Sequence, residues 1–127
     1  MSSSPVIAVV DDDEGTREAL SELLQTLALP CRTFDGAEAF LAAYATGSFD
    51  CLMTDVRMPG MSGLELQQKL GSLGSTIPVI VVTSSTDPAI RSRALKDGAL
   101  AYLHKPVNDE VLIRHLKIAL GRDFVCR

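Results

Sequence analysis

The chain has 127 residues, of which 46% are apolar, and it carries 12 basic and 16 acidic side chains for a net charge of −4. A chain of this length can form one domain without help from a metal or a disulfide, and no apolar run approaches the roughly 18 residues that a membrane span requires. The acidic balance argues against nucleic-acid binding by this chain alone, because contacts with phosphates need clustered lysine and arginine.

The first elements in chain order are a short leader, a strand and a helix. Residues 1–4 lack the basic and apolar regions of a signal peptide, so we expect a disordered leader and a cytoplasmic protein. Residues Val6–Val10 form a continuous apolar run, which is typical of a strand covered on both faces. Asp13 is placed to cap the helix that follows. The apolar stripe of that helix has the i, i+3, i+4, i+7 spacing, at Leu20, Leu23, Leu24 and Leu27.

Two further strands flank the second predicted helix. Residues Cys31–Phe34 indicate a weak strand, and Asp35 with Glu38 three positions later resembles a capping box. The helix that this cap would begin is expected to stop near Gly47. Residues Cys51–Thr54 form a third short strand.

A helix, a strand and another helix come next. Ser62 and Glu65 form a second capping box. The apolar stripe of the helix behind it lies at Leu66, Leu70 and Leu73. Val79–Thr83 is the clearest strand after the first. Asp87–Pro88 supplies an N-cap and a first helical residue, and Gly98 ends that helix.

The last strand and helix complete an alternating pattern. Residues Ala101–His104 predict a strand, and Asn108 caps a helix that runs to about Gly121, followed by a tail over residues 122–127. Five strand–helix units in strict alternation build a parallel sheet with right-handed crossovers. We therefore expect residues 5–121 to form an α/β domain, a flavodoxin-like, doubly wound five-stranded parallel sheet in the order 2-1-3-4-5 with helices on both faces.

The three cysteines, Cys31, Cys51 and Cys126, are widely spaced and include no C-x-x-C pair, so they indicate neither a zinc site nor a redox motif. We expect inert thiols. In the predicted order, the strands that carry Cys31 and Cys51 flank the first strand, so these two residues should not be bonded.

Acidic side chains follow two strands that are neighbours in this order. Asp11 and Asp12 come directly after the first strand and Asp55 directly after the third, and neighbouring strands lie about 4.8 Å apart. The carboxylates should converge at the switch point of the sheet, where their repulsion needs a positive partner. An oxygen-only site favours Mg²⁺ over zinc, with Mn²⁺ a possible substitute.

A hydroxyl and a lysine are predicted on the same rim. Thr83 ends the fourth strand and Lys105 follows the fifth. Acids, a hydroxyl and a lysine around a hard cation suit transfer of a phosphoryl group to a carboxylate. Each of these residues alone would most often be a helix cap, an ordinary strand-end threonine or a surface side chain, so it is their convergence that indicates a site.

Four segments together resemble the bacterial response-regulator receiver domain, and the resemblance covers nearly the whole chain. The segments are Val9–Asp12, Asp55–Gly63, Thr83–Ser84 and Lys105–Pro106. The resemblance implies a phosphoacceptor signalling domain, not an enzyme, that takes a phosphoryl group from a sensor histidine kinase onto Asp55 and assists its own phosphorylation and dephosphorylation.

The resemblance also implies a metal site. Asp11, Asp12 and Asp55 would bind Mg²⁺ together with the backbone carbonyl of Arg57. The long basic side chain of Arg57 lies beside the phosphoryl site, where it bears on the lifetime of the phosphate.

The resemblance also implies which residues bind the phosphoryl oxygens and which residue changes conformation when the phosphoryl group is bound. Thr83 and Lys105 would bind those oxygens, and the Lys105–Pro106 peptide would be cis. Tyr102 matches the switch aromatic of the family. Phosphorylation would then rearrange one face of the domain, which is also a possible homodimer interface. This face is made by the helix that begins at Asp87–Pro88, the strand before Lys105 and the last helix.

One further segment bears on the output of the signal. The segment Met58–Leu66 resembles receivers that precede a helix-turn-helix domain. We expect the amino-terminal piece of a longer regulator that binds DNA through that further domain and controls transcription. A protein that works alone through protein contacts is the alternative.

Three rival functions fit the sequence less well. Phosphatases of the haloacid-dehalogenase type resemble one another in a D-x-D motif after the first strand and in a cap insertion. Here the presumed nucleophile Asp55 is followed two residues later by Arg57 and not by a second aspartate. In a flavin-binding electron carrier, the acidic run Asp11–Glu14 would repel the phosphate. A degenerate receiver would lack the intact acids.

Overall fold

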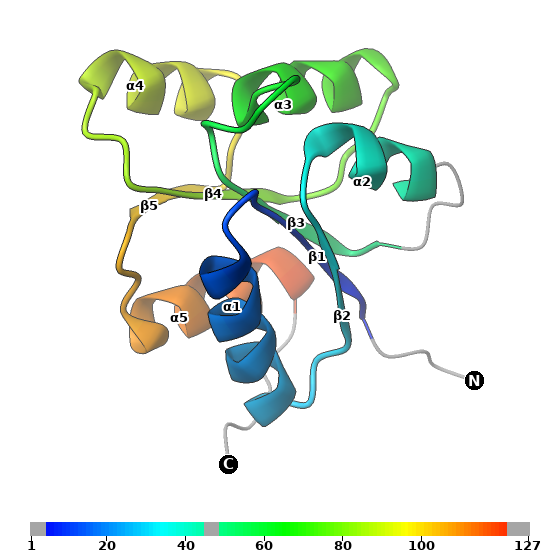
Figure 1. Ribbon diagram of the computed structural model, residues 1–127, viewed down its shortest axis with the longest axis vertical. Helices are drawn as coiled ribbons and strands as arrows, with labels where there is room; N and C mark the ends of the chain where they lie inside the picture. Colours follow the sequence, from blue (N-terminus) through cyan, green and yellow to red (C-terminus); the bar gives the residue numbers. More distant parts are fainter. Residues whose placement is uncertain (1–4, 45–48, 122–127) are drawn as a thin grey trace.

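The computed structural model describes residues 5–44 and 49–121, in which five strands alternate with five helices (Figure 1). The predicted leader 1–4, the tail 122–127 with Cys126, and the expected helix end near Gly47 lie outside these residues. The elements are β1 (Ile7–Val10), α1 (Glu14–Thr26), β2 (Cys31–Phe34), α2 (Ala37–Tyr44), β3 (Cys51–Thr54), α3 (Gly63–Ser72), β4 (Val79–Thr83), α4 (Pro88–Lys96), β5 (Ala101–His104) and α5 (Asp109–Leu120).

All five strands are parallel and lie in the order β2-β1-β3-β4-β5. The register places Val10, the last residue of β1, beside Phe34 of β2 and Thr54 of β3. The residues that follow β1 and β3 therefore emerge side by side at one edge. The predicted fold class, an α/β flavodoxin-like sheet in the order 2-1-3-4-5, is confirmed.

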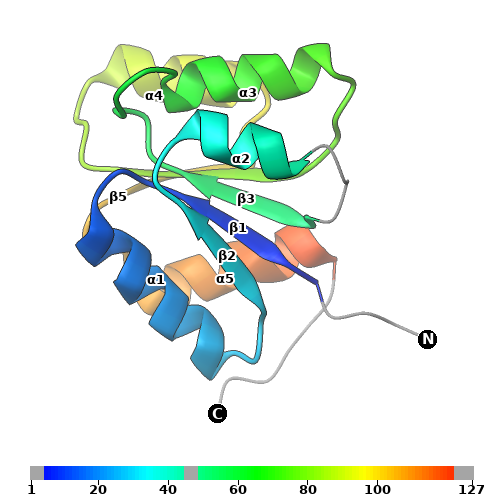
Figure 2. The same cartoon turned by 45° about the vertical axis from the view of Figure 1, so that its right-hand side comes forward.

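Helices cover both faces of the sheet, with α1 and α5 on one face and α2, α3 and α4 on the other (Figures 1 and 2). The central strands β1, β3 and β4 are buried along their whole length, which explains their continuous apolar runs. The edge strands β2 and β5 are only partly buried, and β2 accordingly has the weakest apolar pattern.

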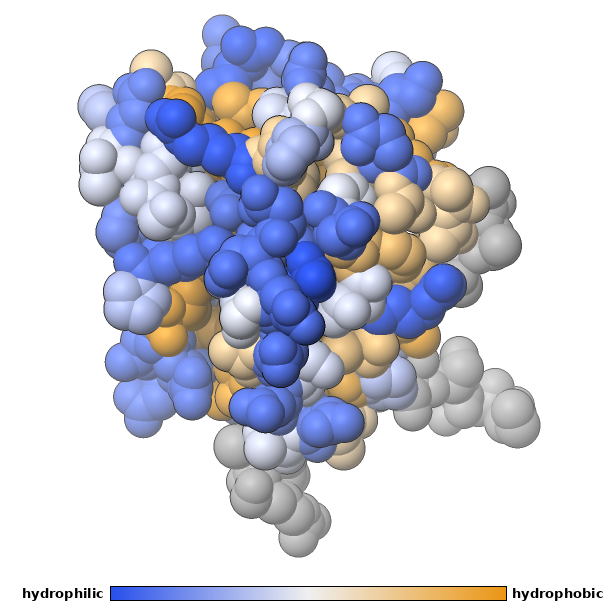
Figure 3. All heavy atoms as spheres, viewed as in Figure 1, coloured by the Kyte–Doolittle hydropathy of each residue, from blue (hydrophilic) through white to orange (hydrophobic). Residues whose placement is uncertain are grey.

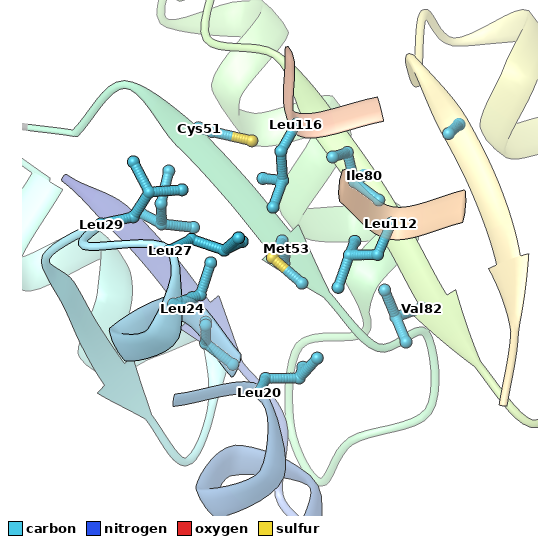
Figure 4. Close-up of a cluster of buried hydrophobic side chains, with 13 residues drawn as sticks. Leu20, Leu24, Leu27, Leu29, Cys51, Met53, Ile80, Val82, Leu112 and Leu116 are labelled. Carbon is cyan, nitrogen blue, oxygen red and sulfur yellow. The ribbon is translucent and has the colours of Figure 1, made fainter. Parts of the chain in front are cut away.

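The core under α1 and α5 is built from aliphatic side chains (Figure 4). Its most buried members include Leu24, Met53, Ile80, Leu112 and Leu116, all at most 1% exposed. Full burial of one such side chain contributes roughly 1.5–3 kcal/mol to folding. This packing holds the strands in place relative to one another. It therefore positions the residues that follow each strand.

Four of the predicted helix starts are present with their caps. The side chain of Asp13 accepts the Thr16 N–H at 3.0 Å, and Ser62 forms a complete capping box with Glu65. The caps of α4 and α5 are Asp87 and Asn108.

Three local predictions are wrong. The helix α2 begins at Ala37, so Asp35 is not adjacent to it, and Glu38 bonds outside its own helix. Leu73 follows the last turn of α3 and is 55% exposed, so it is not part of the apolar stripe. The strand β1 begins at Ile7, because the Val6 N–H donates to the Asp50 carboxylate instead of to the sheet.

The surface of the face shown in Figure 3 is mainly hydrophilic over α1. None of the helices in residues 5–44 and 49–121 has the length and apolar content to cross a membrane. Cys31 and Cys51 are free thiols on the two strands that flank β1, as the predicted order requires.

Candidate functional site

Three carboxylates lie together where β1 and β3 end. Asp11 and Asp12 follow β1, Asp55 follows β3, and one oxygen atom from each lies within 4.8 Å of the others. Asp11 and Asp55 are 2% and 7% exposed, whereas Asp12 is open to solvent. The acids converge because β1 and β3 are neighbours in the sheet.

Lys105, directly after β5, brings a positive charge to the acids. Its Nζ lies 2.8 Å from Asp11 Oδ2 and 3.0 Å from Asp55 Oδ2, so one ammonium bridges both buried carboxylates. Burial raises the pKa of Asp11, although the hydrogen bond from Lys105 acts against it. Burial alone would lower the pKa of Lys105, but the hydrogen bonds to the two carboxylates outweigh it and raise that pKa. The lysine is therefore held in its charged form.

Asp55 is held at both of its carboxylate oxygens. Its Oδ1 accepts the Val56 N–H at 2.6 Å, while Oδ2 contacts Lys105. A Cβ atom on Gly63 would lie 2.0 Å from the Asp55 carbonyl oxygen, so glycine is required for α3 to begin this close to Asp55. The Gly63 N–H also donates to the Val56 carbonyl at 2.8 Å. The loop between β3 and α3 is thus tied back onto the end of the strand.

Thr83 ends β4 at the same edge of the sheet and is 1% exposed. Its Oγ1 accepts the Ser85 N–H at 3.2 Å, and a hydroxyl in that role keeps its proton to donate elsewhere. The Lys105 backbone N–H donates to the Thr83 carbonyl at 2.8 Å and keeps the two residues together. The Tyr102 hydroxyl donates to the Ser85 carbonyl at 3.4 Å, so Ser85 bonds both Thr83 and Tyr102.

Arg57 lies in the loop after Asp55 and is exposed. Arg57 and Asp12 line one open depression of about 480 Å³. The loop therefore borders the acid cluster. The Lys105–Pro106 peptide on the other side of the site is cis, as expected.

Two contacts at this edge of the sheet were not predicted. Arg17 Nη1 donates to the Asp11 carbonyl oxygen at 2.7 Å, and Glu38 Oε2 accepts the Met61 N–H at 3.0 Å. Both side chains reach from a helix to a neighbouring loop. The apolar periodicity of a helix gives no information about such contacts, and the only signal for Glu38 was its spacing from Asp35, which suggested a cap.

The donor set fits a hard divalent cation. The three clustered side chains offer only carboxylate oxygens, which suits Mg²⁺ with its preference for one or two carboxylates, waters and phosphate oxygens. A buried carboxylate, a cluster of acids that could hold a cation, an ammonium and a hydroxyl therefore lie at one edge of the sheet. This combination suits phosphoryl transfer, in which positioning and charge stabilisation do most of the work.

Sequence comparison finds both a family and individual relatives. The family model described as the response regulator receiver domain matches residues 7–117. The response regulator protein TmoT of Ectopseudomonas mendocina is 41% identical over 115 residues, which cover 91% of this chain and 52% of TmoT. The transcriptional regulatory protein FixJ of Azorhizobium caulinodans is 40% identical over 122 residues, 96% of this chain and 58% of FixJ. The chain spans about half the length of the curated relatives it matches.

Solved structures show the same likeness. The response regulator StyR superimposes with a TM-score of 0.87 at 38% identity, over 94% of this chain and 60% of that one. FixJ-N gives a TM-score of 0.85 at 35% identity, over 98% and 99% of the two chains. The chemotaxis protein CheY4 of Vibrio cholerae gives 0.84 at 28% identity, over 93% and 100%.

Proposed function

Because the chain belongs to the response regulator receiver domain family, we propose that it accepts a phosphoryl group on Asp55 from a sensor histidine kinase, with Mg²⁺ bound. The observation that carries the proposal is the setting of Asp55. It is the buried acid at the tip of the central strand β3, and Lys105 links it to Asp11 at the tip of β1.

In the transfer, a carboxylate oxygen of Asp55 attacks the phosphorus of the donor. The new O–P bond forms as the P–N bond to the donor histidine breaks, and the imidazole leaves neutral after taking up a proton. The Val56 N–H orients the carboxylate through Oδ1. Lys105 releases a carboxylate oxygen and turns its N–H donors to the phosphoryl oxygens, where its charge offsets theirs.

Asp11, Asp12, Asp55 and the backbone carbonyl of Arg57 would hold the Mg²⁺. When bound, the ion neutralises charge on the acids and on the phosphoryl oxygens. The two buried acids need such a partner once Lys105 has turned to the phosphoryl group, since unpaired carboxylates at this depth repel each other strongly.

Thr83 and Tyr102 would carry the signal away from the site. The Thr83 hydroxyl donates to a phosphoryl oxygen and so draws the threonine toward the crevice. Ser85, which bonds both side chains, then shifts its carbonyl, and the Tyr102 ring follows inward. The face formed by α4, β5 and α5 changes shape and can bind a partner or a second copy of the chain.

The output of this signal would lie in a further domain. The two FixJ proteins, named transcriptional regulatory proteins, match this chain over only 58% of their own length. We infer that the full-length protein carries a DNA-binding output domain and controls transcription.

Acetyl phosphate with Mg²⁺ tests the proposal without a kinase. The wild type and the control Asp35→Asn, which changes an exposed acid, should gain the mass of one phosphoryl group, and chelation of the metal should prevent it. Asp55→Asn should gain none. Equal phosphorylation of Asp55→Asn would overturn the assignment.

A further inference from the structure

Arg17 reaches back from α1 to the loop that carries the acids. It lies in the first turns of the helix, where its backbone N–H donates to the Asp13 carbonyl at 3.1 Å. Its side chain extends past that cap, and Nη1 donates to the Asp11 carbonyl oxygen at 2.7 Å. This is the short distance of a strong charge-assisted hydrogen bond.

The side chain has acidic alternatives that it does not use. Glu14, Glu18 and Glu22 line one surface depression with Arg17. Within residues 5–44 and 49–121, however, the ion pairs shorter than 4.0 Å involve only Arg93 and Lys105. The guanidinium is therefore directed at a backbone carbonyl in the acid loop, and not at the carboxylates beside it.

That carbonyl belongs to the peptide joining Asp11 to Asp12. Asp11 is consequently held at three points, because its Oδ1 accepts the Asp13 N–H and its Oδ2 contacts Lys105. Asp12 is different, since its side chain has no hydrogen-bond partner among the described residues. Because a peptide unit is planar, the carbonyl held by Arg17 also fixes the direction of the bond from the Asp12 nitrogen to its Cα, from which the side chain departs.

We propose that Arg17 is a positioning residue for Mg²⁺: it fixes the Asp11–Asp12 peptide so that the exposed Asp12 carboxylate stays beside Asp11 and Asp55. The proposal rests on the magnesium site of the proposed function and adds a residue to it. Loss of contacts that orient metal ligands typically weakens metal binding about 10- to 100-fold.

The sign of the effect separates positioning from simple electrostatics. A positive charge near three acids disfavours a divalent cation, so removal of the Arg17 charge would by itself tighten Mg²⁺ binding. Removal of the hydrogen bond to the carbonyl would loosen it. Lysine keeps the charge but lacks the planar fork of donors, so it should restore the bond poorly.

Isothermal titration calorimetry of Mg²⁺ into the metal-free protein tests this directly. Arg17→Lys should raise the Kd for Mg²⁺ by about tenfold, and Arg17→Gln should raise it by a smaller factor, because loss of the charge offsets part of the loss of the bond. The control Arg114→Gln makes the same charge change at an exposed position on α5 and should bind as the wild type does. Amide NMR spectra of metal-free Arg17→Lys should show shifts at Asp12 and Asp13.

The outcomes distinguish the possible failures. Wild-type or tighter Mg²⁺ binding by Arg17→Gln, with or without a lower Tm, would overturn the positioning role and leave Arg17 a structural residue of α1. Wild-type affinity of Arg17→Lys for Mg²⁺ would show that the hydrogen bond from the guanidinium to the Asp11 carbonyl does not position the metal site. A wild type that binds no Mg²⁺ would instead overturn the proposed metal site, and the inference with it.

Discussion

Lys105 is the residue on which the charge balance of the acid cluster depends. It bridges two carboxylates that are almost fully buried, while its own side chain is 21% exposed. Replacement by methionine keeps the apolar stem and leaves the acids unpaired. Because removal of one partner from a buried ion pair leaves an uncompensated charge, we expect Lys105→Met to lower the free energy of unfolding by about 2 kcal/mol in metal-free buffer.

Urea unfolding with chelator and then with Mg²⁺ measures this effect. The metal should recover part of the loss, because it replaces the missing charge. Lys69→Met, at an exposed position on α3, serves as the control and should unfold as the wild type does. Wild-type stability of Lys105→Met in metal-free buffer would show that the two acids need no partner.

Cys51 gives a pH-dependent prediction in the core. Burial raises the pKa of its thiol from 9.0 to about 12. The folded value lies above the unfolded one, so the contribution of this group to stability is complete below about pH 9 and is lost as the pH rises toward 12, at up to about 1.4 kcal/mol per pH unit.

Alkylation of the native protein at pH 8, followed by peptide mass spectrometry, checks the state of this thiol. Cys31, which is partly exposed, should be labelled, and Cys51 should react only after denaturant is added. Labelling of Cys51 in the native protein at the rate of the unfolded chain would contradict its burial.

Most residues of the candidate site could be predicted because each follows a strand. Asp11, Asp55 and Lys105 needed only the strand order, since parallel strands end at one edge of the sheet. The contacts of Arg17 and Glu38 could not be predicted, because they depend on how long side chains cross from a helix to a loop. Nothing in the spacing of a sequence encodes such a path.

The helix α3 gives a matched pair of substitutions that tests how closely it approaches Asp55. A Cβ at Gly63 would lie 2.0 Å from the Asp55 carbonyl oxygen, whereas one at Gly71 would meet nothing within 4 Å. Gly63→Ala should therefore lower the free energy of unfolding by about 3 kcal/mol, while Gly71→Ala should raise it by roughly 0.5–1 kcal/mol through better helix propensity.

Thermal or urea unfolding distinguishes the two variants, and phosphorylation by acetyl phosphate reports on the site. Gly63→Ala should also react slowly, because the backbone of Asp55 must move to accept the methyl group. Equal stability of the two variants would mean that the contact between α3 and Asp55 is loose.

At the scale of elements, one sequence pattern had two outcomes. Ser62 and Glu65 form the capping box that their spacing predicts. Asp35 and Glu38 have the same spacing, but Glu38 bonds the Met61 N–H in the loop after β3. A tertiary donor competes with the local cap for the same carboxylate, and a local pattern contains no information about that competitor. The strand β1 was predictable because burial on both faces leaves a continuous apolar run.

The buried face of α3 carries a polar residue that the apolar periodicity of the helix does not predict. Gln67 is 6% exposed, and its Nε2 donates to the Ala94 carbonyl of α4 at 2.9 Å. The amide nitrogen of this residue is satisfied by the end of a neighbouring helix, while its buried Oε1 has no hydrogen-bond partner among the described residues. The contact links α3 to the helix that borders the proposed switch face.

At the scale of the whole molecule, the phosphoryl group should act at a distance from the crevice. The proposed route follows the hydrogen bonds from Thr83 through Ser85 to Tyr102. Because a ligand shifts a two-state equilibrium only by its differential contacts, coupling of about 1–3 kcal/mol between the site and this face would be ordinary. Beryllofluoride, which mimics the phosphoryl group, should shift amide resonances over α4, β5 and α5 as well as around Asp55.

Two variants make this test specific. Tyr102→Phe removes the hydroxyl that bonds Ser85 and keeps the ring, so it should retain beryllofluoride binding with smaller shifts on α4. Tyr44→Phe is the control, because the Tyr44 hydroxyl donates to Ser75 and both residues lie outside the proposed route. Shifts confined to the crevice in the wild type would mean that this route of signalling does not exist.

The central claim is that one carboxylate, at the tip of β3, receives the phosphoryl group. Borohydride reduces an aspartyl phosphate, but not a free aspartate, to homoserine, so tandem mass spectrometry of the reduced protein identifies the acceptor by position. After incubation with acetyl phosphate and Mg²⁺, we predict homoserine at position 55 and at no other aspartate. Homoserine at position 11 or 12, or a phosphoryl group that resists reduction because it resides on His104 or His115, would contradict the account.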